Sequence, residues 1–268
     1  MVADPPPSGA RLEEVSHQRS SEGRAAATDA ASFPVVAIGA SAGGLEAFRT
    51  LLTALPAKSG MCFILVQHLD PSHSSMMVEL LSSHTAMTVV EAGEGMKLQP
   101  DHVYVIPPGR YLALSKAVLH LSGPRGTQSV RMPFDFLLQS LAEAVGERSV
   151  CTILSGTASD GSIGAKAIKA AGGLVIAQDP DEAEYDGMPR NAIAAGAVDL
   201  ILPLAKIPEA LARFAGHRYV KAAASDAALP AGEGTAQIIE LLRKKTVHDF
   251  ALYKDGTIGR RIARRMAM

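Results

Sequence analysis

Residues 35–44 read Val-Val-Ala-Ile-Gly-Ala-Ser-Ala-Gly-Gly, and this stretch decides the fold. Its first four residues form a short β-rich run, and the glycine that follows predicts a tight turn. After the turn, large apolar residues recur at helical spacing, at Leu45, Phe48, Leu51 and Leu52. A strand that passes through a glycine turn into a helix is half of a β-α-β unit, so the stretch predicts an α/β domain.

The same alternation continues along the chain. Two short alternating runs, 111–114 and 118–121, indicate an inserted β-hairpin. Because strands alternate with helices over short connections, we expect a doubly wound, mostly parallel sheet with helices on both faces. Further strands are expected at residues 61–66, 87–90, 103–106, 150–154, 174–177 and 200–202, and further helices at 76–81, 134–141, 163–171, 190–195 and 207–214.

The composition divides the chain into four parts. Residues 1–32 are rich in Pro, Ser, Ala and charged residues, which predicts a disordered tail. The expected domain spans 33–216, and an Ala-rich linker spans 217–233. Residues 234–268 predict a short basic helical segment, since positions 238–268 hold eight Lys or Arg against three acids, a formal charge of +5.

Composition also argues against several classes of protein. The formal net charge is −1, and aromatic residues make up 4% of the chain with no Trp. Neither a basic field nor a stacking platform is therefore expected for nucleic acid. No apolar run approaches the ~20 residues of a membrane span, and the N-terminus lacks the apolar stretch of a signal peptide. We expect a cytoplasmic protein with no nucleic-acid partner and no membrane insertion.

The two cysteines, Cys62 and Cys151, both lie inside apolar runs. Such positions favour buried, reduced thiols. Two cysteines in these positions supply neither a disulfide scaffold nor the ligand count of a zinc site. No metal and no cofactor are expected.

Ser41 is the first candidate for chemistry. It satisfies the pattern G-x-S-x-G between a strand and a helix, where a serine Oγ stands clear of the backbone as a nucleophile. The amides of Ala42, Gly43 and Gly44 in the first helical turn are candidates to stabilise an oxyanion. Two other interpretations stay open, a helix-capping or phosphate-binding serine and a dinucleotide-binding turn, although the next strand ends in Gln67 rather than an acid.

His68 and Asp160 are the candidate partners of Ser41. His68 follows the buried run 61–66, and Asp160 follows the run 150–154 and a glycine-containing loop. Because the carboxyl ends of parallel strands meet at one edge of a sheet, the three residues are expected at the same edge. An imidazole there can take the serine proton, and a carboxylate can orient the imidazole. The pattern alone does not choose Asp160 over Asp70, Asp179 or Asp199.

Taken together, these motifs resemble the catalytic domain of the chemotaxis receptor methylesterases, the CheB family. The resemblance covers residues 35–211 and implies a doubly wound α/β sheet with a triad of Ser41, His68 and Asp160, with Thr157 as a further oxyanion or substrate-loop candidate. It is carried by Ile38-Gly39-Ala40-Ser41-Ala42-Gly43-Gly44, Gln67-His68, residues 105–109 (Val-Ile-Pro-Pro-Gly), Leu154-Ser155-Gly156 through Asp160-Gly161, and Gly187-Met188-Pro189-Arg190.

The family resemblance also implies a reaction. Members are hydrolases that cleave glutamate methyl esters on chemoreceptors and release methanol, and some deamidate receptor glutamines. The expected partners are therefore the cytoplasmic helices of methyl-accepting chemoreceptors, with a methyltransferase or another chemotaxis component as a further expected partner. An alternative hypothesis is a catalytically weak adaptor of a chemotaxis-like signalling complex.

The sequence departs from the family pattern at several points. Ala42 stands where Thr is common, and Thr157-Ala158 stand where Met-Gly is common, so Ala158 is expected to strain its loop if its φ is positive. The 32 residues before the domain are too few for the receiver domain of typical members, so no receiver domain in cis is expected. Residues 238–266 resemble the start of a receptor methyltransferase, as in a truncated fusion, without predicting methyltransferase activity.

Overall fold

A computed structural model describes residues 31–67, 76–123, 132–217, 220, 235–245, 259, 261, 262 and 264–266. Its centre is a seven-stranded sheet in the order β3-β4-β2-β1-β7-β8-β9, in which every neighbouring pair is parallel. The strands are β1 (Val35–Ala40), β2 (Cys62–Gln67), β3 (Thr88–Glu91), β4 (His102–Val105), β7 (Ser149–Ile153), β8 (Leu174–Gln178) and β9 (Leu200–Leu202).

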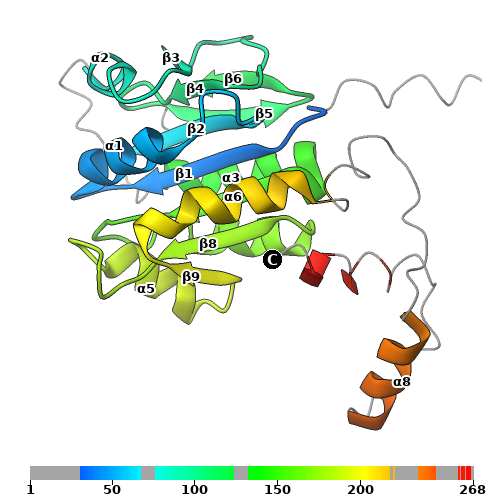
Figure 1. Ribbon diagram of the computed structural model, residues 1–268. Coiled ribbons are helices and arrows are strands. Elements are labelled where there is room, and N and C mark those ends of the chain that lie inside the picture. The colour runs from blue at the N-terminus through cyan, green and yellow to red at the C-terminus, as the bar shows by residue number, and fades with distance from the viewer. Residues whose placement is uncertain are drawn as a thin grey trace, which may run out of the picture.

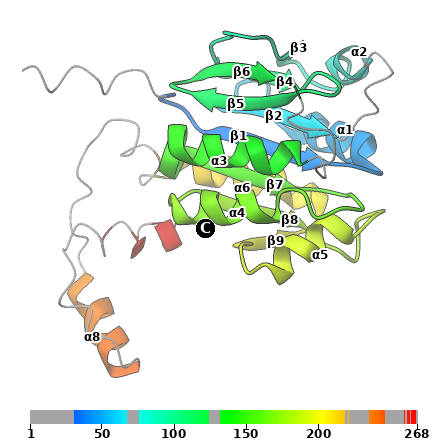
Figure 2. The ribbon, with the colours of Figure 1, turned by 180° about the vertical axis from the view of Figure 1, so that it is seen from behind.

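Helices cover both faces of this sheet (Figures 1 and 2). Alternate residues of β1 point to opposite sides: Val36 and Ile38 join one buried cluster, and Val35 and Ala37 join the other. The first cluster includes residues of α1, α2 and α6, and the second includes residues of α3, α4 and α5. The helices are α1 (Gly44–Ala54), α2 (Met77–Ser82), α3 (Pro133–Val145), α4 (Ser162–Ala170), α5 (Gly187–Ala194), α6 (Ile207–Gly216) and α8 (Thr235–Lys245), with 3-10 turns η1 (Gly146–Arg148) and η2 (Leu204–Lys206).

The inserted hairpin is formed by β5 (Tyr111–Ser115) and β6 (Val118–Ser122), which pair antiparallel outside the main sheet. Leu112 and Leu119 are fully buried in the cluster that α3 also joins. The amide of Leu114 donates to Ser140 Oγ of α3 at 3.0 Å. The predicted fold class, a doubly wound parallel sheet with an inserted hairpin, is confirmed.

The order of the strands creates a switch point beside β1. The chain moves from β1 to β2 on one side and later returns to β7 on the other side of β1. The connections after β1 and β7 therefore leave the sheet in opposite directions. In an open α/β sheet the crevice between two such loops is where ligands bind.

The ends of the domain are only partly described. Ala31 is buried, and its carbonyl accepts a hydrogen bond from Arg148 Nε at 2.9 Å. Of the predicted disordered tail 1–32, residues 1–30 lie outside the described residues, and so does the predicted linker 217–233 except for positions 217 and 220. Among the helices that the structure describes, none combines the length and apolarity needed to cross a membrane.

Candidate functional site

Ser41 follows the last residue of β1, at the carboxyl edge of the sheet. Gly43 caps helix α1 with a φ of 73°, a left-handed conformation that favours glycine. Its surroundings also exclude a side chain, because an added Cβ would lie 2.7 Å from Ser155 Oγ and 2.8 Å from Glu184 Oε2. The turn therefore places Ser41 directly before the positive end of the α1 dipole.

The backbone amides of this turn differ in their hydrogen bonds. The Gly44 amide donates to the Ser41 carbonyl at 3.0 Å, so this donor is used within the turn. The amides of Ala42 and Gly43 have no acceptor among the described residues. Of the three amides that the sequence suggested as oxyanion donors, those of Ala42 and Gly43 therefore remain available to donate to a substrate oxygen.

The loop after β7 lies against the Ser41 turn. The Ser41 amide donates to the carbonyl of Ser155 at 3.0 Å. Ser155 Oγ donates to the Ala42 carbonyl at 2.9 Å and accepts from the Tyr185 amide at 3.0 Å. The Ser155 amide in turn donates to Gln178 Oε1 at 3.0 Å. Ser155 thus joins the loops that follow β1, β7 and β8, a role that the sequence pattern did not reveal.

Gly156 leaves room for close packing around Ser41. A Cβ at Gly156 would lie 2.2 Å from the sulfur of Met188 and 3.1 Å from Ser41 Cβ. Gly187 lies equally close to the loop, because its Cβ would fall 2.9 Å from the Thr157 carbonyl oxygen. The Gly-Met-Pro-Arg segment therefore packs against the 155–157 loop and holds this loop beside Ser41.

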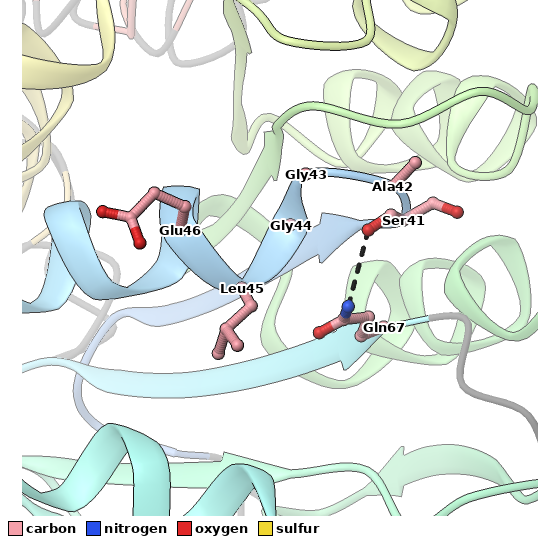
Figure 3. Close-up of a pocket in the computed structure, with 7 residues that line it drawn as sticks. All are labelled: Ser41, Ala42, Gly43, Gly44, Leu45, Glu46 and Gln67. Carbon is pink, nitrogen blue, oxygen red and sulfur yellow. Dashed lines mark hydrogen bonds between the residues drawn. The ribbon is translucent and has the colours of Figure 1, made fainter.

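Gln67, the last residue of β2, lies on the other side of Ser41 (Figure 3). Its Nε2 is 3.5 Å from the Ser41 carbonyl, a long contact. Its buried Oε1 has no hydrogen-bond partner in the part of the chain that the structure describes. A cavity of about 430 Å³ opens here and is lined by Ser41, Ala42, Gly43, Gly44, Leu45, Glu46 and Gln67. His68, the predicted base, is the next residue and lies outside the described residues.

Asp160 lies in the same loop cluster, after β7, and is 2% exposed. Its Oδ2 accepts from the amide of Phe134 at 2.9 Å, and its Oδ1 accepts from the amide of Asp135 at 2.8 Å. These are first-turn amides of α3, so the carboxylate sits at the positive end of that helix dipole. The dipole stabilises negative charge on Asp160.

The other candidate carboxylates are placed differently. Asp179 follows β8, one strand further from β1 than the loop of Asp160. Asp199 precedes β9 and accepts from the Val175 amide near the start of β8, so it lies at the amino edge, opposite Ser41. Asp70 lies outside the described residues. Among the described aspartates, Asp160 therefore has the position that best suits a partner of the Ser41 site.

Two loop residues correct or refine expectations from the sequence. Ala158 is not among the described residues with positive φ, so the strain expected there is not present. Its carbonyl accepts from Asn191 Nδ2 at 3.1 Å, which ties the loop to α5. Thr157 is exposed, and its amide has no acceptor among the described residues, which leaves it available at the rim of the site.

Burial and charge shift several pKa values around the site. Burial raises the pKa of the Asp135 carboxyl, and the nearby Asp160 raises it further. Arg190 holds the pKa of Asp186 below its usual range through a direct hydrogen bond. Burial also raises the pKa of the thiols of Cys62 and Cys151, which keeps both protonated. No group of three or more His, Cys, Asp or Glu among the described residues is arranged to hold a metal ion.

Comparisons with known proteins agree with the fold. A family model described as CheB methylesterase matches residues 36–211. A protein-glutamate methylesterase/protein-glutamine glutaminase of Bordetella parapertussis is 37% identical over 194 residues, which are 70% of this chain and 55% of that protein. The crystal structure of the Thermotoga maritima CheB methylesterase catalytic domain is 31% identical with a TM-score of 0.63, and the match covers 68% of this chain and 98% of that one.

These matches cover different shares of the relatives, which limits what they show about this chain. A putative protein-glutamate methylesterase/protein-glutamine glutaminase of Leptospira interrogans (strain Fiocruz L1-130) is 34% identical, with 68% of this chain and 95% of that protein covered. By contrast, the chain spans about half the length of the Bordetella relative. The family model ends at residue 211, so the resemblance of residues 238–266 to a methyltransferase gains no support from it and stays a prediction.

Proposed function

The chain belongs to the CheB methylesterase family, and we propose that it hydrolyses glutamate methyl esters on chemoreceptors through Ser41, His68 and Asp160. The observation that carries this proposal is the direct contact of two loops at the switch point of the sheet. The amide of Ser41 donates to the Ser155 carbonyl at 3.0 Å, and this contact with the loop that also carries the buried Asp160 supports a site that combines Ser41 and Asp160.

In the proposed reaction, Ser41 Oγ attacks the ester carbonyl while His68 accepts the serine proton. The amides of Ala42, Gly43 and Thr157 are the donors that would stabilise the oxyanion, since each lacks an acceptor among the described residues. The bond to the methoxy group then breaks, His68 returns the proton, and methanol leaves. Water hydrolyses the acyl-enzyme in the same way and frees the glutamate.

The same site is proposed to act on receptor glutamines. A carboxamide presents the same carbonyl to Ser41, with ammonia in place of methanol as the leaving group. The cavity beside Ser41 is open and lined on one side by the amide side chain of Gln67, a polar wall suited to a short polar side chain. The expected substrates are cytoplasmic helices of methyl-accepting chemoreceptors, because these carry the esters and amides on exposed glutamyl positions.

The test measures methanol released from a methylated chemoreceptor fragment. We expect Ser41→Ala to lower kcat by about 10³-fold or more, because the acyl-enzyme can no longer form. Ser59→Ala is the matched control: Ser59 donates to Asp101 near the amino edge of the sheet, away from Ser41. Equal turnover by wild type and Ser41→Ala, or no methanol from wild type, would overturn the proposal.

A further inference from the structure

Asp135, in the first turn of α3, is a buried carboxyl that the proposed reaction does not use. It is 6% exposed. Its Oδ1 accepts hydrogen bonds from the amides of Ile163 at 3.0 Å and Gly164 at 2.6 Å, both in the first turn of α4. Its Oδ2 is buried and has no hydrogen-bond partner within the described residues. A carboxyl kept in such a place needs a reason beyond the two hydrogen bonds, because burial disfavours its charge.

Asp135 and Asp160 cap each other's helices. The Asp160 carboxylate accepts the first amides of α3, including that of Asp135 itself at 2.8 Å. The Asp135 carboxylate accepts the first amides of α4, and α4 begins only two residues after Asp160. The two caps therefore form a closed loop of contacts, from Asp160 to α3, from α3 to α4, and from α4 back to Asp160.

Gly161 makes this connection short and stiff. It has a φ of 97°, a conformation that favours glycine, and an added Cβ would lie 2.6 Å from Cδ1 of Phe134. The single residue between Asp160 and α4 is thus packed against the same turn of α3 that holds the Asp160 carboxylate. A shift at the start of α4 would pass directly to Asp160.

We propose that Asp135 is a positioning residue for the reaction: by capping α4, its carboxyl fixes the loop that carries Asp160. This role rests on the proposed function. A displacement of about 1 Å in a catalytic array lowers rates by ~10²-fold even when substrate still binds. Loss of the cap should therefore lower kcat and leave KM nearly unchanged when the assay is run well below the thermal midpoint, where every molecule is folded and a loss of stability alone would leave kcat unchanged.

The experiment compares three substitutions of Asp135 with one elsewhere. Asp135→Ala removes the cap, Asp135→Ser is too short to reach both amides, and Asp135→Asn keeps an oxygen that can accept from both. The matched control is Asp199→Ala, which removes an equally buried carboxylate at the opposite edge of the sheet. For each variant, kcat and KM for a methylated receptor fragment are measured together with the thermal midpoint.

We expect Asp135→Ala and Asp135→Ser to lose about 10- to 100-fold in kcat with KM within ~2-fold, and Asp135→Asn to stay within ~3-fold of wild-type kcat because the cap is kept. Asp199→Ala should lower the thermal midpoint without this loss of kcat. If Asp135→Ala fails to fold, Asp135→Ser against Asp135→Asn decides the question.

Two results would overturn the role of Asp135 alone. One is an active wild type whose kcat is unchanged by Asp135→Ala or Asp135→Ser. The other is a loss of kcat in Asp135→Asn as large as that in the shortened variants, since the cap would then not be what matters. A wild type with no turnover that depends on Ser41 would instead overturn the proposed function, and this role with it.

Discussion

Two buried aspartates stand at opposite edges of the sheet, and they are held by different kinds of partner. Asp160, at the carboxyl edge, accepts hydrogen bonds from two backbone amides at the start of α3. Asp199, at the amino edge, pairs with Lys169 Nζ at 3.3 Å and with Arg264 Nη2 at 2.9 Å. The whole Asp160 residue and the Asp199 side chain are each 2% exposed, so both carboxylates are buried and the difference lies in their donors.

The difference matches what each carboxylate can do. The two backbone amides that orient Asp160 carry no formal charge, so these hydrogen bonds leave the carboxylate able to stabilise an imidazolium. Lys169 and Arg264 neutralise the Asp199 carboxylate, which also accepts a hydrogen bond from the Val175 amide at the start of β8. Uncharged amide donors suit a carboxylate that takes part in a reaction. The ion pairs of Asp199 instead suit a carboxylate that joins distant segments of the chain.

The largest difference between the two aspartates is expected when the charge is removed at each edge in turn. Asp160→Asn should lower kcat for methyl ester hydrolysis by about 10⁴-fold, as expected for the carboxylate of a serine triad. Asp199→Asn should leave kcat within about 2-fold, because Asp199 lies at the edge opposite Ser41. Methanol release from a methylated receptor fragment measures both. Similar losses in the two variants would contradict the division of roles.

For the free energy of unfolding we expect the reverse order, with the larger effect from substitution of Asp199. Asp199→Ala removes the carboxylate that pairs with Lys169 and Arg264, whose side chains are 37% and 17% exposed. Because both cations can partly reach water, we expect a loss of about 2 kcal/mol rather than the ~3–5 kcal/mol of a fully buried broken pair. Urea unfolding followed by circular dichroism measures it. A loss below ~0.5 kcal/mol would mean that the pair is a surface contact only.

A smaller loss of stability is expected from substitution of Arg264, the partner of Asp199. Arg264 Nε donates to the Gly172 carbonyl at 3.0 Å, and its Nη2 donates to the Gly173 carbonyl at 2.6 Å. Arg264→Ala removes these bonds but leaves Asp199 paired with Lys169, so we expect a loss of about 1 kcal/mol.

A lysine at position 264 provides a control, because it keeps the positive charge but changes the geometry of the donors. Arg264→Lys should restore little, because an ammonium lacks the planar fork that reaches two carbonyls and a carboxylate together. Chymotrypsin digestion of the C-terminal segment should be faster in both variants than in wild type. Wild-type digestion rates in Arg264→Lys would show that charge alone holds the segment.

The smallest effect concerns Asp135 and pH. Its pKa is raised above the ordinary 3.8 by burial and by Asp160. The folded chain therefore holds a proton that the unfolded chain releases, and the stability this gives is present below pH 3.8 and is lost as the pH rises through the raised pKa. Asp135→Asn should flatten this decline. Thermal unfolding between pH 3.5 and pH 8 measures it, in steps of about half a unit, and identical pH profiles for the two proteins would contradict it.

The fold could be predicted because its signals are local. The β-rich run before Ser41, the glycine turn and the helical spacing after it lie within 20 residues and match β1 and α1 as observed. The caps of Asp135 and Asp160 could not be predicted, because 25 residues separate the two and the contact depends on how α3 and α4 pack. The pairing of Arg264 with Asp199 spans 65 residues and has no local signal at all.

The site was predictable in part for the same reason. A serine after a glycine turn and an aspartate after a buried strand mark the ends of strands, and parallel strands bring such ends to one edge. The sequence did not reveal Ser155, whose hydroxyl bridges the Ala42 carbonyl and the Tyr185 amide. Nor did it show that Ala158 would fit its loop without positive φ, or that its carbonyl would accept a hydrogen bond from Asn191, 33 residues away in the sequence.

The contacts of Arg264 with Gly172, Gly173 and Asp199 have a practical consequence for attaching this protein to a surface. The C-terminal segment meets the domain beside the start of β8, at the end of the sheet away from Ser41 (Figures 1 and 2). A tag or a sensor-chip linkage attached through that segment would therefore leave the edge that holds Ser41 facing the solution. Attachment through a cysteine introduced in α2 or in the 155–161 loop would instead crowd the Ser41 site, which a receptor helix would have to reach under the proposed function.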